Sequence, residues 1–245
     1  MNFETKVLTI IPAAGKGSRV NLRVPKILIK IKNQRIIDIL IQKVSNVSKN
    51  FVFVVSPKHK EKIKKYLSDH YKNKIKYNIV TQNKPLGMGN AVLKANKFSK
   101  KFQKILIIWG DHIGVSKTSI NKINKIKFKN NTCILPLVKI RNPYVQYIFK
   151  NNNLQTILES REGDISSNIG YSDKGTFLFH SKNLPKYLNE FKKTNNRGSI
   201  TKEQNFLPFF IFLKRKKWNI KKIIFKNSLQ TKGVNTKDDI KSFNR

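Results

Sequence analysis

The feature that most constrains this chain is the alternation of short apolar runs with helical segments over its first 110 residues. The apolar runs are rich in β-branched and aromatic residues and are short enough to be buried strands, whereas the segments between them carry apolar residues at helical spacing. The predicted strands are 7–11, 51–56, 74–81 and 104–109, and the predicted helices are 35–44, 58–67 and 90–98. Such an alternation predicts a parallel, doubly wound sheet in an α/β fold.

The pattern changes after residue 131, where β-runs follow one another with turn residues between them. This part predicts a mixed or antiparallel extension of the same sheet. Its predicted strands are 132–138, 144–149, 154–159, 175–179 and 218–225, and its predicted helices are 184–193, 201–213 and 238–243. No strong linker interrupts the chain, so we expect a single domain over residues 1–245.

Charge is the unusual part of the composition. The chain has 51 Lys plus Arg against 13 Asp plus Glu, a formal net charge of +38. A field of this sign attracts phosphorylated molecules. The lysines are spread along the whole chain among many Asn and Ile, which share A/T-rich codons, whereas a nucleic-acid footprint is a patch or stripe. We therefore expect no dedicated nucleic-acid partner.

Other classes are excluded by what the chain contains. One cysteine, Cys133, allows no internal disulfide and no multi-cysteine metal site. From the polar residues among the first positions we expect no signal peptide, and the apolar run at 206–213 is too short to span a bilayer. We expect no membrane span and a cytoplasmic location.

A loop with small and basic residues follows the first predicted strand. It reads Ala13-Ala-Gly-Lys-Gly-Ser-Arg19 and is followed by Pro25-Lys26. Small residues let an anion approach the main chain closely, and the cations Lys16, Arg19 and Lys26 favour a polyphosphate. The spacing matches neither a P-loop nor a dinucleotide fingerprint. These residues alone leave open an ordinary strand-to-helix turn with solvated basic side chains.

Three further segments carry polar groups at the ends of predicted strands. A tight loop at 82–90 can bring main-chain groups against the edge of a base, or can be a plain connection. Asp111 follows the buried strand 104–109, where open α/β sheets bind ligands, and its carboxylate suits a divalent metal. Asn235 lies between the last strand and the terminal helix. Either residue could instead cap a helix.

Taken in order, these segments resemble the sugar-phosphate nucleotidyltransferase family, in particular the uridylyltransferase domains of bacterial N-acetylglucosamine-1-phosphate uridylyltransferases. The shared motifs are Gly-x-Gly-Ser-Arg…Pro-Lys over 15–26, Gln…Leu-Gly-x-Gly over 82–89, Gly-Asp at 110–111 and Gly-Val-Asn at 233–235. The resemblance implies a Rossmann-like, mostly parallel but mixed sheet with helices on both faces, of the nucleotide-diphospho-sugar transferase type. Residues 1–131 would form the nucleotide-binding half and 132–245 the acceptor-binding half. No hexapeptide array is found, so we expect this chain to lack the family's acetyltransferase half.

The resemblance also implies an activity and its residues. An NTP, with UTP the first expectation, and a sugar 1-phosphate would give an NDP-sugar and pyrophosphate with Mg²⁺ as cofactor. The implied site comprises Arg19 and Lys26 as catalytic residues; Ala13, Ala14, Gly15, Lys16, Gly17, Gln82, Gly87 and Met88 for the nucleotide; Asp111 and Asn235 for the metal; and Gln146, Glu159, Asp173 and Glu203 for the acceptor.

Departures from the family's motifs leave several alternatives open. Met88 and Asn90 replace a Thr and a His in the base-reading segment, and Asp173 replaces an Asn near the acceptor. The base and the acceptor therefore stay open, and a cytidylyltransferase acting on a polyol or choline phosphate is an alternative. A non-catalytic nucleotide-binding protein is a further alternative, and a homo-oligomer is one of the assembly states left open.

Overall fold

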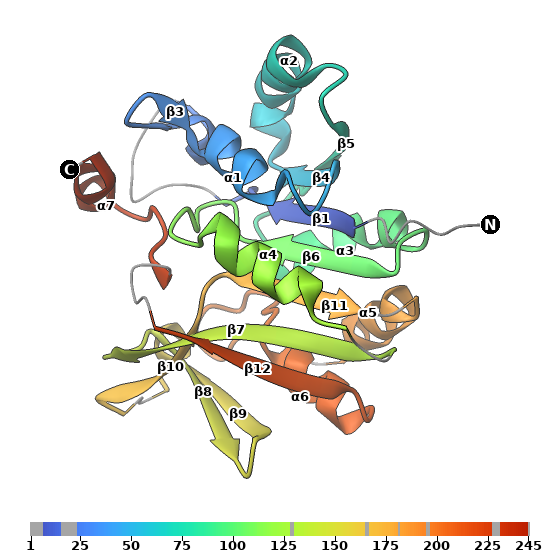
Figure 1. Ribbon diagram of the computed structural model, residues 1–245, viewed down its shortest axis with the longest axis vertical. Coiled ribbons are helices and arrows are strands. Elements are labelled where there is room, and N and C mark those ends of the chain that lie inside the picture. Colours follow the sequence, from blue (N-terminus) through green and yellow to red (C-terminus); the bar gives the residue numbers. More distant parts are fainter. Residues whose placement is uncertain are drawn as a thin grey trace.

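The computed structural model describes residues 7–15, 24–127, 130–164, 167–180, 182–194, 197–226 and 231–244. Within these ranges the protein has one sheet of ten strands, with the order β5-β4-β1-β6-β11-β7-β10-β8-β9 and with β12 paired to β7 (Figure 1). A separate short hairpin consists of β2 (Lys30–Ile31) and β3 (Gln34–Arg35). The two halves expected from the sequence therefore share one continuous sheet.

The first part of the sheet is parallel and the second is mixed. β1 pairs in parallel with β4 on one side and β6 on the other, and β5 extends β4 in the same direction. The described strands of this part are β1 (Val7–Pro12), β4 (Asn50–Val55), β5 (Lys76–Thr81) and β6 (Lys104–Ile108). Strand order therefore reverses at β1, which is the point where open α/β sheets bind ligands.

The second part joins through β11, which runs antiparallel to both β6 and β7. β7 also pairs with β10 in antiparallel and with β12 in parallel fashion. The strands of this part are β7 (Thr132–Arg141), β8 (Val145–Lys150), β9 (Asn153–Glu159), β10 (Ile169–Asp173), β11 (Thr176–His180) and β12 (Asn219–Phe225). The expected mixed sheet is confirmed.

Helices cover both faces of the sheet because strand side chains alternate between two apolar layers. In β4, Phe51, Phe53 and Val55 join the layer under α1, α2, α4 and α7, whereas Val52 and Val54 join the layer under α3, α5 and α6. The helices are α1 (Ile36–Val44), α2 (Lys60–Tyr71), α3 (Met88–Ser99), α4 (Lys117–Lys125), α5 (Leu184–Lys192), α6 (Pro208–Arg215) and α7 (Lys237–Asn244), with single 3₁₀ turns η1 (Lys26–Leu28), η2 (Pro57–His59) and η3 (Ser160–Glu162).

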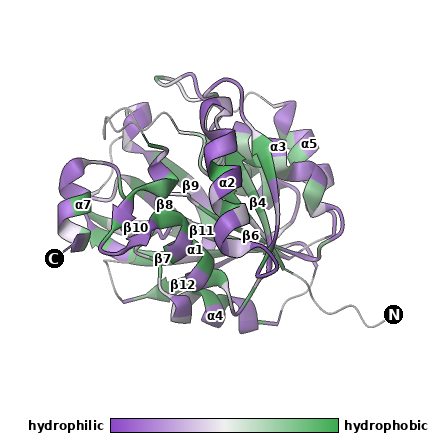
Figure 2. Ribbon diagram, turned by 90° about the horizontal axis from the view of Figure 1, so that it is seen from above, coloured by the Kyte–Doolittle hydropathy of each residue, from purple (hydrophilic) through white to green (hydrophobic). Residues whose placement is uncertain are grey.

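The layers explain how a lysine-rich chain builds a core. Figure 2 shows apolar residues along the strands and polar residues over much of the helix surfaces. Of the helices in the described ranges, none is long and apolar enough to cross a bilayer.

One predicted helix is wrong in its extent. The sequence predicts a helix over 201–213, but α6 begins only at Pro208. Residues 201–207 instead run alongside the loop before α3, where Gln204 N–H donates to Leu86 O (2.7 Å) and Gly89 N–H donates to Gln204 O (2.8 Å). Proline lacks the N–H that a helix interior needs, so Pro208 fits only the first turn. The sequence patterns also missed α4, β10 and the short hairpin of β2 and β3.

Candidate active site

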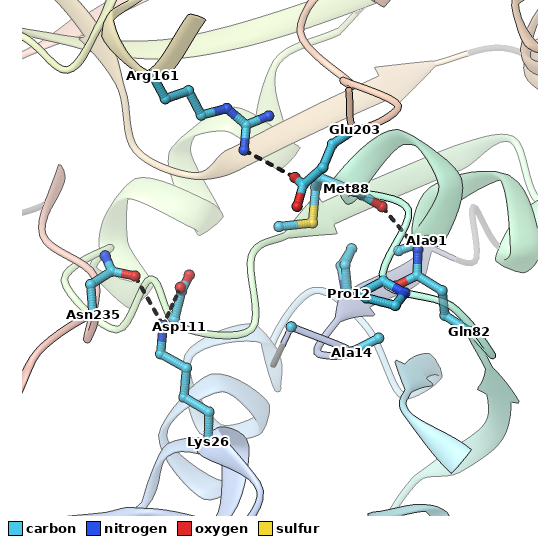
Figure 3. Close-up of a pocket in the computed structure, with 13 residues that line it drawn as sticks. Pro12, Ala14, Lys26, Gln82, Met88, Ala91, Asp111, Arg161, Glu203 and Asn235 are labelled. Atoms are coloured by element: carbon cyan, nitrogen blue, oxygen red, sulfur yellow. Dashed lines mark hydrogen bonds and ion pairs between the residues drawn. The ribbon is translucent and has the colours of Figure 1, made fainter. Parts of the chain in front are cut away.

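The centre of the candidate site is a cluster of Lys26, Asp111 and Asn235 (Figure 3). The Lys26 ammonium donates to Asp111 Oδ2 at 2.7 Å and to Asn235 Oδ1 at 3.0 Å. These residues are 85 and 209 positions from Lys26 in the sequence. A cation is therefore already held between a carboxylate and an amide oxygen at the ligand-binding edge of the sheet.

Main-chain hydrogen bonds explain why the three residues meet. Asp111 follows β6, and Gly110 N–H donates to Pro12 O at the end of the neighbouring β1 (3.1 Å). Val234 N–H donates to Asp111 O at 2.9 Å, which places Asn235 beside the end of β6. The buried side chain of Val234 secures this contact. Lys26 begins η1 directly after Pro25, whose fixed φ suits the residue before a helical turn.

The loop at 82–90, which the sequence analysis expected beside the base, lies very close to the 203–205 segment at two glycines. Gly87 has φ +95°, and a Cβ there would lie 2.8 Å from Gln204 O and from Glu203 Cβ. A Cβ on Gly89 would lie 2.6 Å from Asn205 O. Only glycine allows residues 87–89 to lie this close to the 203–205 segment. The Gln82 amide donates to Gly87 O (3.0 Å) and so fixes the loop from the β5 side.

These elements surround one cleft with two adjoining pockets. The first has a volume of about 360 Å³ and is lined by Pro12, Ala14, Gly15, Lys26, Gln82, Pro85, Gly87, Met88, Ala91, Asp111, Arg161, Glu203 and Asn235. The second, of about 480 Å³, lies toward β8–β11, and its lining includes Trp109, His112, Tyr144, Glu159 and Asp173. Met88, Asp111, Arg161, Glu203 and Asn235 line both pockets, so they lie at the boundary between them.

Arg161 is a boundary residue to which the sequence analysis assigned no role. Its guanidinium donates to Glu159 Oε2 (3.3 Å), to Glu203 Oε2 (3.4 Å) and to the Asn205 amide oxygen. Arg161 therefore connects the wall of the second pocket with the segment that supports the Gly87 loop. The signal in the sequence was the grouping of Glu159, Glu162 and Asp164 around one arginine in a chain with so few acidic residues.

The carboxylates of this region have different environments. Burial raises the pKa of Glu159, and Arg161 opposes that shift. Burial also raises the pKa of Asp173, which accepts hydrogen bonds from Gly175 N–H (2.6 Å) and from the Tyr147 hydroxyl (3.2 Å). Burial acts in the same direction on Glu162. Hydrogen bonds from the Thr201 hydroxyl and N–H, the Asn205 amide and Ile200 N–H outweigh it and lower the pKa of Glu162 to about 2.

The structure brings most of the expected residues together. Ala14, Gly15, Lys26, Gln82, Gly87, Met88, Asp111, Asn235, Glu159, Asp173 and Glu203 line one or both pockets. Ala13 is partly buried and packs against the core beside the end of β1. Gln146 does not line either pocket: its amide donates to the Ser167 hydroxyl and accepts from Ser167 N–H. Lys16, Gly17 and Arg19 lie outside the described residues.

The Lys26 cluster has the donor chemistry that Mg²⁺ needs. Asp111 and Asn235 present two hard oxygen atoms that already share one cation, the Lys26 ammonium. Within the described ranges, no group of three or more His, Cys, Asp or Glu side chains is placed to hold a metal. An ion with two protein ligands and further oxygens from phosphates and water fits the preference of Mg²⁺ for sites completed by a substrate.

Comparison with solved structures supports the fold. A protein from Bacillus anthracis assigned as a glucose-1-phosphate thymidylyltransferase, solved in complex with a sucrose, superposes with a TM-score of 0.74. The match covers 97% of this chain and 94% of that one, at 16% sequence identity. The protein therefore has the fold of that protein, as the resemblance of its sequence motifs implied.

Sequence comparison identifies the family. The model of the nucleotidyl transferase family matches residues 8–203, and the chain belongs to that family. The bifunctional protein GlmU of Buchnera aphidicola subsp. Baizongia pistaciae is 31% identical over 192 residues, which are 77% of this chain and 42% of that protein. GlmU from the subspecies Schizaphis graminum is 28% identical over 239 residues, 96% of this chain and 50% of that protein. The chain thus spans about half the length of these curated relatives.

Proposed function

We propose that the protein is a sugar-phosphate nucleotidyltransferase that condenses an NTP with a sugar 1-phosphate to an NDP-sugar and pyrophosphate. The observation that carries this proposal is the Lys26, Asp111 and Asn235 cluster at the boundary of two pockets. One pocket adjoins the glycine loops, which suit a nucleotide, and the other carries buried carboxylates, which suit the hydroxyls of a sugar. Membership of the nucleotidyl transferase family supports this assignment.

Catalysis of this reaction requires positioning of the substrates and stabilisation of charge, and it requires no general base. The attacking atom is a phosphate oxygen that is already ionised at neutral pH, so no proton has to be removed. The barrier comes from bringing two anions together and from charge on the transferred phosphoryl group. Lys26 is placed to stabilise that charge, since it lines the first pocket and its ammonium contacts Asp111 and Asn235, which line both pockets. Asp111 and Asn235 would hold Mg²⁺, which supplies further positive charge to the phosphates when bound.

The two pockets divide the remaining roles. Ala14, Gly15, Gln82 and Gly87 would receive the nucleotide, and the chain's sequence pattern assigns Lys16 and Arg19 to its phosphates. Glu159 and Asp173 would accept hydrogen bonds from the acceptor. Gln146 lines neither pocket and hydrogen-bonds Ser167, so we do not assign it to the acceptor. Because the reaction consumes an NTP, the proposal places the protein in the cytoplasm.

UTP with N-acetylglucosamine 1-phosphate is the first pair to test, since the curated relatives that match 96% of this chain include GlmU proteins. Purified protein is incubated with each of four NTPs plus dTTP, with several sugar 1-phosphates and with choline phosphate, and pyrophosphate release is followed with and without Mg²⁺. We expect turnover with at least one sugar 1-phosphate, and its loss in Asp111→Ala. Turnover with choline phosphate alone would show the cytidylyltransferase alternative, and nucleotide binding without turnover would show a non-catalytic protein.

A further inference from the structure

The turn that carries Asn235 is held by a residue outside the cleft, Asp239 of α7. The Asp239 carboxylate oxygen Oδ2 accepts the N–H groups of both Asn235 and Thr236, each at 2.7 Å. The Asp239 N–H in turn donates to the Thr236 hydroxyl at 3.1 Å. Two carboxylate contacts therefore fix the main chain at Asn235, while the Asn235 side chain faces Lys26.

Part of this arrangement is an ordinary capping box. Thr236 is the residue before α7 and Asp239 is its third helical residue, so their reciprocal hydrogen bonds satisfy the first turn of the helix. The bond from Asn235 N–H does not belong to that box, because Asn235 precedes the capping residue. This additional contact contributes nothing to the helix itself and acts only on the residue proposed as a metal ligand.

The other side of Asn235 and the far end of α7 are also anchored. Val234 N–H donates to Asp111 O, so the chain is fixed immediately before Asn235 as well. The Asn244 amide oxygen near the end of α7 accepts the N–H of Lys32, six residues after Lys26. Ile240 and Phe243 pack against the core cluster that contains the η1 residues next to Lys26. In Figure 1, α7 lies at the edge of the molecule beyond β3.

We propose that Asp239 is a positioning residue for the metal ligand Asn235, and that α7 thereby connects the Asn235 turn with the segment carrying Lys26. The inference rests on the proposed function, because it concerns the same metal site. Hydrogen bonds to metal ligands typically change metal affinity or activity by about 10–100-fold when they are removed. Loss of Asp239 therefore weakens the metal site while the cleft residues themselves stay unchanged.

The chain offers matched controls for the test. Asp238→Ala removes the same charge from the same turn of α7, but Asp238 is exposed and its carboxylate pairs with the Lys241 ammonium (3.4 Å). Thr236→Ala removes the hydroxyl that caps the helix and leaves both N–H contacts of Asp239 available. Asp239→Asn keeps a carbonyl oxygen that can accept both N–H groups. These variants separate charge, helix capping and positioning.

The experiment measures metal binding in two ways. The Mg²⁺ concentration for half-maximal turnover is determined for the full chain with its best NTP and acceptor, and Mn²⁺ binding in the presence of UTP is followed by electron paramagnetic resonance. In Asp239→Ala we expect the Mg²⁺ concentration for half-maximal turnover to rise about tenfold and the affinity for Mn²⁺ to fall about tenfold. Both values should stay within about twofold of those of the unsubstituted protein in three control variants, Asp238→Ala, Thr236→Ala and Asp239→Asn. Thermal unfolding should shift similarly in Asp239→Ala and Thr236→Ala.

A double-mutant cycle with Asn235→Ala tests whether Asp239 acts through Asn235. In the Asn235→Ala background, Asp239→Ala should cause no further loss of Mn²⁺ binding, because the side-chain oxygen that Asp239 positions for the metal is already gone. A full additional tenfold loss, or equal behaviour of Asp239→Ala and Asp238→Ala, would overturn the assignment. If Asp239→Ala does not fold, a tenfold loss in the folded Asp239→Asn variant overturns it as well. Failure of the proposed function looks different: the unsubstituted protein itself would neither turn over nor bind Mn²⁺.

Discussion

Lys26→Ala is expected to lower turnover by at least a hundredfold while leaving the protein folded. The ammonium group lies in the first pocket, 2.7 Å from Asp111 Oδ2 and 3.0 Å from Asn235 Oδ1, and these two residues line both pockets. Removing one preorganised group that stabilises transition-state charge typically costs a factor of about 10²–10³ in kcat, or about 2.7–4 kcal/mol. Lys26 carries a full charge, so at least the lower end of that range is expected.

The effect of the same substitution on stability should be much smaller. The side chains of Lys26 and Asp111 are 19% and 23% exposed, so solvent screens the pair. Ion pairs near the surface contribute about 1 kcal/mol or less, which shifts Tm by about 2–4 °C in a protein of this size. Loss of one positive charge also relieves repulsion in a chain of net charge +38. Activity and stability should therefore separate.

Pyrophosphate release under saturating substrates gives kcat, and calorimetry gives Tm. Lys30→Ala is the matched control, because Lys30 is an exposed lysine of the nearby β2 and lines neither pocket. The reasoning is refuted if Lys26→Ala keeps more than a tenth of the turnover with an unchanged Tm. It is also refuted if Lys30→Ala loses as much activity, since that would assign the effect to net charge.

Three further predictions concern the loop and the buried carboxyls. Gly87→Ala should raise the KM for the NTP by about tenfold or more with a smaller change in kcat, because its Cβ would lie 2.8 Å from Gln204 O; an unchanged KM contradicts the loop assignment. Burial raises the pKa of Asp173, so this carboxyl favours folding below its unfolded pKa of about 3.9 and that contribution is lost as the pH rises through the folded value. The free energy of unfolding of Asp173→Asn, measured in urea, should therefore increase relative to that of the unsubstituted protein as the pH rises from 4 to 7. A difference between the two free energies that does not change with pH contradicts this prediction. The pKa shift of Glu162 has the opposite sign. Because this pKa is lowered to about 2, the ionised carboxylate stabilises the fold above about pH 4.3. Glu162→Ala should cost about 2 kcal/mol at pH 7, with a gap that narrows as the pH falls from 4 to 2.

The first half of the fold could be predicted because its signal is local. β1, β4 and β6 are apolar runs bounded by turn residues, and buried parallel strands need only that pattern. The cleft residues at the ends of the parallel strands, including Gln82 and Asp111, follow from the same pattern, since the carboxyl ends of parallel strands share one edge. Lys26 stood out only as one of three cations of the loop, and its catalytic role could be assigned only through the family motif.

The second half depended on pairing that the sequence does not display. β10 carries a glycine and polar residues, and it is a strand because β7 and β8 lie on either side of it. The segment 201–207 has helical spacing, yet close packing of Gly87 and Gly89 against residues 203–205 holds it in another conformation. Pro208 was the one local signal for the true start of α6.

The acidic residues show why a composition dominated by lysine can still reveal a site. Lysine is so frequent here that a single lysine carries little information, whereas only 13 carboxylates occur in the whole chain. Four of them, Asp111, Glu159, Asp173 and Glu203, line the cleft, and Glu162 lies within 3.6 Å of Arg161. Carboxylates that gather at one cleft of such a basic chain set the local charge there, and this makes them informative about the site. In a chain so rich in lysine, the positions of the few acidic residues are therefore a better guide to the site than the positions of the lysines.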